Sequence, residues 1–198
     1  MIDAAVAEIE DNGIDISVRR IADRLGVPRP VVYRHFADRA DLDEQIRRRV
    51  LESLLAELMP TLHPDGTVQA AVGAAIGAYL GWIERHPRLH HFLAARRDGP
   101  SAGLSDARHQ IGGALAHLFE AAMAQHGVDT APARPMAFGH IGLVDSVVNS
   151  WRADPASPLT SDQVAAMLVE SVLVLIEGNA RVWGVPVTRD TLIADILG

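Results

Sequence analysis

Apolar residues recur with a helical period along almost the whole chain, and residues 17–36 hold two short periodic segments in close succession. The first segment has apolar residues spaced i, i+3, i+4 and i+7, as on one face of a helix: Val18, Ile21, Ala22 and Leu25. Ser17 directly precedes this stripe, so we expect its hydroxyl to cap free backbone N–H groups. Gly26 follows it and is expected to end the helix in a left-handed conformation.

A second short helix is predicted to begin near Arg29 or Pro30. Pro28 and Pro30 lack the N–H group that a helix interior needs and a first turn does not. The spacing predicts that Val32 and Phe36, one turn apart, are buried. Two helices joined by a turn that contains glycine form a helix-turn-helix, which places its second helix in the DNA major groove. The segment therefore predicts DNA binding.

The rest of the chain also has helical period, and no hairpin or βαβ pattern is present. We expect an all-α fold of about ten helices. Besides the helix-turn-helix, the expected helices cover residues 2–12, 38–60, 68–86, 87–97, 105–126, 136–151, 161–183 and 188–197. Ser161 is the expected cap of the long helix that it opens.

Two of these helices, residues 136–151 and 164–176, are apolar almost all round. A helix with two apolar sides must pack on both. We favour a second copy of the chain as the additional partner, which predicts a homodimer built through a helical bundle. The alternative is that both are central helices of a monomeric core. The stretch 164–176 contains Glu170 and is shorter than the roughly 20 residues that span a bilayer, so no membrane association is expected.

Composition narrows the class of protein. The 198 residues are 48% hydrophobic but only 5% aromatic, so the core must consist mainly of Ala, Val, Leu and Ile. The absence of cysteine excludes disulfides, thiol catalysis and zinc–thiolate sites. The first residues are acidic and do not resemble a signal peptide, which favours a cytoplasmic location.

The charge is unevenly distributed. The net charge of −7 is unexpected for a DNA-binding protein, but residues 17–49 hold nine arginines and five acidic residues, a local charge of +4. This local excess of positive charge is what contact with DNA phosphates requires. Every basic residue is an arginine, which can form forked contacts to phosphate or guanine.

The helix-turn-helix resembles that of the TetR family of transcriptional repressors. The resemblance covers residues 2–42 and rests on Gly13, on SVRRIA (17–22), LGV (25–27) and YRHF (33–36), and on Leu42. The stretch VPRPVVYRHFADRADL (27–42) is similar to the tetracycline-repressor type. The family often has a basic arm before the first helix, whereas this sequence starts directly at Met1, Ile2 and Asp3, and Arg39 stands where a lysine is usual.

The resemblance implies a homodimer with two domains in each subunit: residues 1–40 as the DNA-binding head, and residues 41–198 as the domain that binds a small-molecule effector and dimerises through its last two long helices. The residues expected to contact DNA are Ser17, Val18, Arg19, Arg29, Pro30, Val31, Tyr33, Arg34, His35 and Arg39. Arg29 is expected on guanine, and Val31 with the Pro30 ring on thymine methyl groups. The alternative is that these side chains are solvated and only shape the helix start.

The effector pocket is expected to be lined by Trp82, Phe119, Phe138, Ile141 and Asp145. Each aromatic residue could instead belong to the core. Asp145 and His140 lie on one mostly apolar helix, and they are either polar anchors for a ligand or a pair that satisfies itself in the core.

A group of three histidines and a run of three arginines are both expected to have no binding role. His86, His90 and His91 invite a metal site, but Pro87 breaks the helix between them and no carboxylate cluster completes the set, so no metal is expected. Arg47, Arg48 and Arg49 are expected to form a solvated face.

Together these features predict a ligand-responsive repressor, without enzymatic activity or cofactor, that a small molecule releases from an inverted-repeat DNA operator. An α-helical metal-dependent enzyme and a dimerisation module without DNA affinity are the alternatives.

Overall fold

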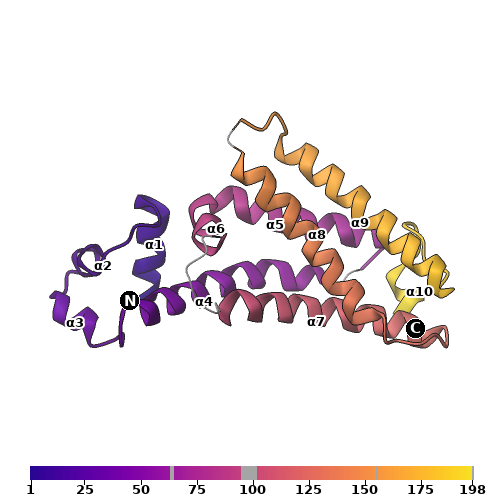
Figure 1. Ribbon diagram of the computed structural model, residues 1–198, viewed down its shortest axis with the longest axis horizontal. Helices are drawn as coiled ribbons and strands as arrows, with labels where there is room; N and C mark the ends of the chain where they lie inside the picture. Colours follow the sequence, from indigo (N-terminus) through magenta and orange to yellow (C-terminus); the bar gives the residue numbers. More distant parts are fainter. Residues whose placement is uncertain (63–64, 95–101, 155, 198) are drawn as a thin grey trace. The chain divides into compact units, whose positions relative to one another are not determined.

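The computed structural model describes residues 1–62, 65–94, 102–154 and 156–197, and throughout these ranges the chain is helical without β-strands, as predicted (Figure 1). The helices are α1 (Ile2–Asn12), α2 (Val18–Leu25), α3 (Arg29–Tyr33), α4 (Arg39–Leu58), the 3-10 helix η1 (Met59–Leu62), α5 (Val68–Arg85), α6 (Pro87–Ala94), α7 (Ala102–Gln125), α8 (Ala133–Ala153), α9 (Ser161–Trp183) and α10 (Ile193–Leu197).

The chain forms two compact units. The first consists of Met1–Ala56 and Gly81–Ala107, and the second of Glu57–Leu80 and Arg108–Gly198. The first unit therefore contains α1, α2 and α3 together with most of α4 and the whole of α6. Helices α5 and α7 each contribute residues to both units.

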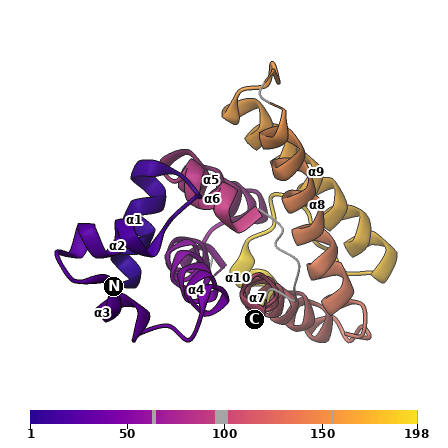
Figure 2. The ribbon, with the colours of Figure 1, turned by 60° about the vertical axis from the view of Figure 1, so that its left-hand side comes forward.

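In the first unit, α2 packs against both α1 and α3 (Figure 2). Ile9 of α1, Ile21 of α2 and Val32 of α3 are completely buried. The Ser17 hydroxyl accepts a hydrogen bond from the Arg20 N–H at 3.3 Å, and Gly26 ends α2 at φ 65°, both as predicted. The fourth position of the predicted stripe differs: Leu25 is 37% exposed, because α2 turns only its Ile21 and Ala22 side toward the core.

The basic run on α4 is not uniformly solvated, so the expectation for Arg47 was wrong. Arg47 is 6% exposed. Its guanidinium lies 4.8 Å from the centre of the Phe92 ring, and its Nη1 donates to the Leu93 carbonyl at 3.3 Å. Both partners belong to α6. The spacing of the three arginines on α4 does not indicate that α6 packs next to them. Arg48 remains exposed.

Helix α6 also contacts α1 within the first unit. Arg88 donates to the backbone carbonyls of Glu10 and Asp11, and His86 Nδ1 contacts the Glu10 carboxylate. These carbonyls lie in the last turn of α1, which has no basic residue of its own. A cation at the C-terminal end of a helix is stabilising, so Arg88 of α6 provides the positive charge that the last turn of α1 does not contain.

In the second unit, α8 and α9 lie side by side (Figure 1). Thr160, rather than the predicted Ser161, caps α9: its hydroxyl accepts from the Gln163 N–H at 3.3 Å, while the Gln163 side chain accepts from the Thr160 N–H at 2.9 Å. Helix α8 begins at Ala133, earlier than the expected residue 136, because the first turn tolerates Pro135. Helix α10 is shorter than expected and begins at Ile193.

Within the described part of the chain, α9 is the one helix whose length and composition would suffice to cross a membrane. Core helices of soluble proteins can have the same length and composition, so these two properties do not establish a membrane span. Glu170 and Glu177 on α9 both bind Arg189 of the segment that follows, which places charged groups along the helix.

Candidate functional site

The short helix α3 turns one side into the head and leaves the other open. Val32 is fully buried, whereas Tyr33 is 65% exposed. Arg29 and Pro30, in the first turn, are exposed, and Val31 is half-buried. An exposed tyrosine beside an exposed arginine provides a hydroxyl donor, a ring and a forked cation on one short helix. These are groups that contact DNA bases and phosphates.

The start of α2 adds further exposed groups. Ser17 and Arg19 are exposed, and Val18 is half-buried. Arg19 Nε lies 3.6 Å from an Asp23 carboxylate oxygen, but both side chains are about 70% exposed, so this ion pair is weak. Arg19 is thus free to exchange Asp23 for a phosphate. Arg34 and His35, which follow α3, are also exposed.

Arg39 has partners inside the head, which the sequence pattern did not predict. Its Nη1 donates to the Ile16 carbonyl at 2.7 Å, and its Nε donates to an Asp43 carboxylate oxygen at 2.9 Å. The side chain is 40% exposed. Arg39 therefore joins the first turn of α4 to the residue before the Ser17 cap.

Two aspartates organise the start of α4. The Asp38 carboxylate, which directly precedes α4, accepts from the Asp41 N–H at 2.8 Å. Asp41 accepts from the Gln45 side chain at 3.0 Å and from the Ala37 N–H at 2.9 Å. These hydrogen bonds, with that from Gln45 as the largest cause, hold the pKa of Asp41 below its ordinary value.

In the second unit, Asp145 forms a polar cluster with residues from two other helices. Arg108 donates to one Asp145 oxygen, from Nη2 at 2.6 Å and from Nε at 2.7 Å, and the Tyr79 hydroxyl donates to the other at 3.4 Å. Burial, followed by the nearby Asp145 charge, raises the pKa of Tyr79 far above its ordinary value. The Tyr79 hydroxyl therefore keeps its proton and acts as the donor.

His140 lies on the same helix as Asp145 but has different partners. Its Nδ1 donates to the Met136 carbonyl at 2.7 Å, and its ring meets the Phe119 ring at a centroid distance of 5.4 Å. Its Nε2 is buried and has no hydrogen-bond partner among the described residues. Burial lowers the pKa of His140, so the ring is neutral and Nε2 presents an unused lone pair. The two residues do not form the core pair that was one of the two interpretations.

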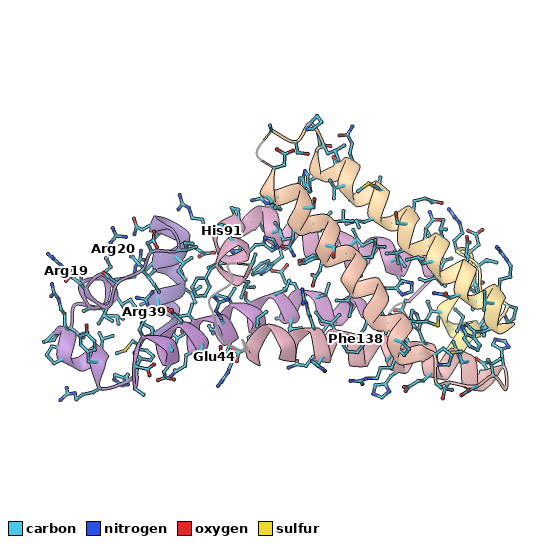
Figure 3. The ribbon with its side chains drawn as sticks, in the orientation of Figure 1. Arg19, Arg20, Arg39, Glu44, His91 and Phe138 are labelled. Atoms are coloured by element: carbon cyan, nitrogen blue, oxygen red, sulfur yellow. The ribbon has the colours of Figure 1, made fainter. Side chains whose placement is uncertain are left out.

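The remaining residues expected to line the pocket are distributed as follows. Phe138 packs against Gly112 of α7 so closely that a Cβ at Gly112 would lie 2.6 Å from its ring (Figure 3). Ile141 and Phe119 are half-buried. Trp82 belongs to the first unit and is fully buried, and its Nε1 has no hydrogen-bond partner among the described residues.

Within the described ranges, no three histidine, aspartate or glutamate side chains come close enough to hold a metal ion together. His90 is buried and His91 is exposed.

Comparisons with known proteins agree with this geometry. Residues 1–46 match the sequence model of the family described as bacterial regulatory proteins, tetR family. An uncharacterized HTH-type transcriptional regulator of Mycobacterium tuberculosis is 26% identical over 166 residues, which cover 83% of this chain and 70% of that protein.

Two solved structures share the fold. A tetR-family transcriptional regulator from Streptomyces coelicolor has a TM-score of 0.70 at 20% identity, over 91% of this chain and 82% of that chain. The transcriptional regulator FadR from Bacillus subtilis, in complex with stearoyl-CoA, has a TM-score of 0.65 at 19% identity, over 89% of this chain and 96% of that chain.

An all-helical chain whose N-terminal helix-turn-helix exposes this set of side chains is a DNA-binding transcriptional regulator. Residues 1–46 match the DNA-binding part of the tetR family, and the chain has the fold of the solved tetR-family regulator from Streptomyces coelicolor.

Proposed function

We propose that the protein is a homodimeric repressor that binds an inverted-repeat operator and is released from it by a small-molecule effector. The observation that carries the DNA-binding part is the open side of α3, where Arg29 and Tyr33 are exposed while Val32 fixes the helix to the core. The local charge of +4 over residues 17–49 supports contact with phosphates.

Each exposed residue has a proposed role. Arg29 would bind guanine, and Val31 and the Pro30 ring would contact thymine methyl groups. The other residues would contact the DNA backbone: Ser17, Val18, Arg19, Tyr33, Arg34, His35 and Arg39. Because Arg39 already holds Ile16 and Asp43, its part in this set includes fixing the head as well as approaching a phosphate.

The dimer would form through α8 and α9. Helix α9 leaves Val174 54% and Val182 76% exposed, and Met167 and Leu175 are also open to solvent. A second copy would cover this apolar side. The test is the sedimentation of Val174→Asp, which is expected to be monomeric, beside Leu192→Asp, an exposed leucine outside α9 that is expected to stay dimeric. A monomeric wild-type protein would contradict the proposal.

The operator would contain two half-sites. In a helix-turn-helix dimer the two recognition helices lie about 34–36 Å apart and enter successive major grooves. The test is selection of genomic fragments by the purified protein. Recovery of fragments with an inverted repeat is the expected result. Uniformly weak binding that salt abolishes, with no preferred fragment, would contradict it.

The effector would bind in the second domain, expected to span residues 41–198, at a site lined by Phe119, Phe138, Ile141 and Asp145. Trp82, the fifth residue of the expected set, belongs to the first unit and is left out of this proposal. The support is the presence of polar groups within apolar helices, namely Asp145 and the unused Nε2 of His140. FadR, of the same fold, was solved with stearoyl-CoA, so the fold accommodates a ligand in that protein.

An effector releases the operator only by its preference for the conformation that does not bind DNA. The test is a compound screen for loss of operator binding, repeated with Asp145→Asn. A compound that releases wild-type protein but acts less strongly on this variant would support the assignment, and equal action on both would contradict the role of Asp145.

A further inference from the structure

The DNA-binding head contains a buried carboxylate. Glu8 of α1 is 4% exposed. One of its oxygens accepts from the Asn12 side chain at 2.8 Å, and the other accepts from Arg24 Nε at 3.3 Å. Arg20 Nη1 lies 3.8 Å from the first oxygen. Two of the three cationic or polar partners therefore come from α2, the first helix of the helix-turn-helix.

A buried charge costs little free energy only when it is paired and hydrogen-bonded. Removal of one partner leaves the other charge buried without compensation. Glu8 meets this condition through its contacts with α2. Arg24 also binds a second acid, Asp11 of α1. Both acids that hold Arg24 thus belong to α1.

The two neighbouring arginines of α2 differ in their surroundings. Arg19 pairs only weakly, with the highly exposed Asp23 of its own helix. Arg20, one residue further on, is 53% exposed, but its guanidinium lies 3.8 Å from the carboxylate of the buried Glu8 of α1. The first helix of a helix-turn-helix crosses the DNA backbone. An unpaired arginine at this position would be near enough to add a phosphate contact.

We propose that Glu8 is a specificity-determining positioning residue: it holds Arg20 and Arg24 against α1, so that neither arginine contributes a sequence-independent phosphate contact. This inference rests on the proposed DNA-binding role of the head. Contacts to phosphates carry no sequence information. By limiting their number, Glu8 lowers the affinity for unrelated DNA and leaves discrimination to the side chains of α3.

The test uses the full-length protein and a short DNA duplex of unrelated sequence. Affinity is measured between about 50 and 200 mM salt, because the logarithm of affinity falls with the logarithm of salt concentration by about 0.9 for each phosphate neutralised. Glu8→Gln keeps the size of the side chain and removes its charge. We expect a slope steeper by about one and an affinity several-fold higher at the lowest salt. A slope equal to that of the wild type would overturn the proposal.

A second pair of variants keeps Glu8 intact, so it remains decisive if Glu8→Gln does not fold. Arg20→Gln is expected to leave the slope unchanged, whereas Arg19→Gln is expected to lower it by about one. If Arg20→Gln lowers the slope as much as Arg19→Gln does, Arg20 already contacts a phosphate and the proposal is wrong. Failure of the wild-type protein to bind any duplex would instead overturn the proposed function itself.

Discussion

Arg39 Nη1 donates a hydrogen bond to the Ile16 carbonyl at 2.7 Å, across 23 residues of sequence. Because Arg39 Nε is also bonded to Asp43, one turn further along α4, the guanidinium plane is fixed by two separate acceptors. Ile16 directly precedes Ser17, the cap of α2. The contact therefore ties the start of α4 to the start of the helix-turn-helix.

Arg39→Lys should weaken operator binding, because lysine has the charge but not the fork that spans both acceptors. A loss of one charge-assisted hydrogen bond predicts about a tenfold decrease in affinity, or ~1.4 kcal/mol. The salt slope of binding should stay the same, since the charge is kept. Arg48→Lys, at an exposed arginine of the same helix, is the control, and equal affinities for the two variants would show that the Ile16 contact has no role.

The packing of Phe138 on Gly112 predicts opposite effects for two adjacent glycines. A Cβ at Gly112 would lie 2.6 Å from the Phe138 ring, whereas a Cβ at Gly113 would meet nothing within 4 Å. Gly113→Ala should raise the free energy of unfolding by up to about 1 kcal/mol through helix propensity. The free energy of unfolding of Gly112→Ala should be about 1–3 kcal/mol lower than that of Gly113→Ala, because the added methyl group overpacks the contact with Phe138. Urea denaturation measures both, and similar values for the two variants would mean that the Phe138 ring moves away without cost.

The capping box of α9 predicts different costs for two neighbouring hydroxyl residues. Thr160→Ala removes the acceptor for the Gln163 N–H and should lower the free energy of unfolding by about 1 kcal/mol. Ser161→Ala, inside the first turn, should change it by less than about 0.5 kcal/mol. Thermal denaturation distinguishes them, and the reverse order would assign the cap to Ser161.

The burial of His140 predicts a pH dependence of stability. Burial lowers the His140 pKa in the folded protein below its ordinary value of 6.5, so the unfolded chain binds more protons below that pH. The free energy of unfolding should therefore fall as pH decreases through 6.5 toward the folded pKa. His140→Gln should show a shallower fall, whereas His126→Gln, at an exposed histidine, should follow the wild type. Urea denaturation at a series of pH values measures this, and identical curves for His140→Gln and wild type would contradict it.

Features set by neighbouring residues were predictable from the sequence. The Ser17 cap and the left-handed Gly26 depend on contacts within one or two turns, and the apolar spacing of α3 indicates which side chain, Val32, faces inward. The same holds for the all-α fold, since helical period is a local property.

Features set by distant partners were not predictable. Arg47 is buried because α6 supplies the Phe92 ring, and no spacing on α4 indicates that contact. Glu8 interrupts the apolar side of α1, and only the position of α2 shows that Arg24 binds it. At the start of α9, two adjacent hydroxyl residues could both cap the helix. Thr160 is the cap because its backbone is extended, whereas Ser161 is already helical.

The central claim is that the open side of α3 recognises DNA. Its most direct test is the affinity of Arg29→Ala and Tyr33→Ala for the genomic fragment that the wild-type protein selects, compared with their affinity for unrelated DNA. Loss of the Arg29 contact to a base should cost about 1–3 kcal/mol on the selected fragment and relax the sequence preference. Wild-type affinity for that fragment in both variants would contradict the account.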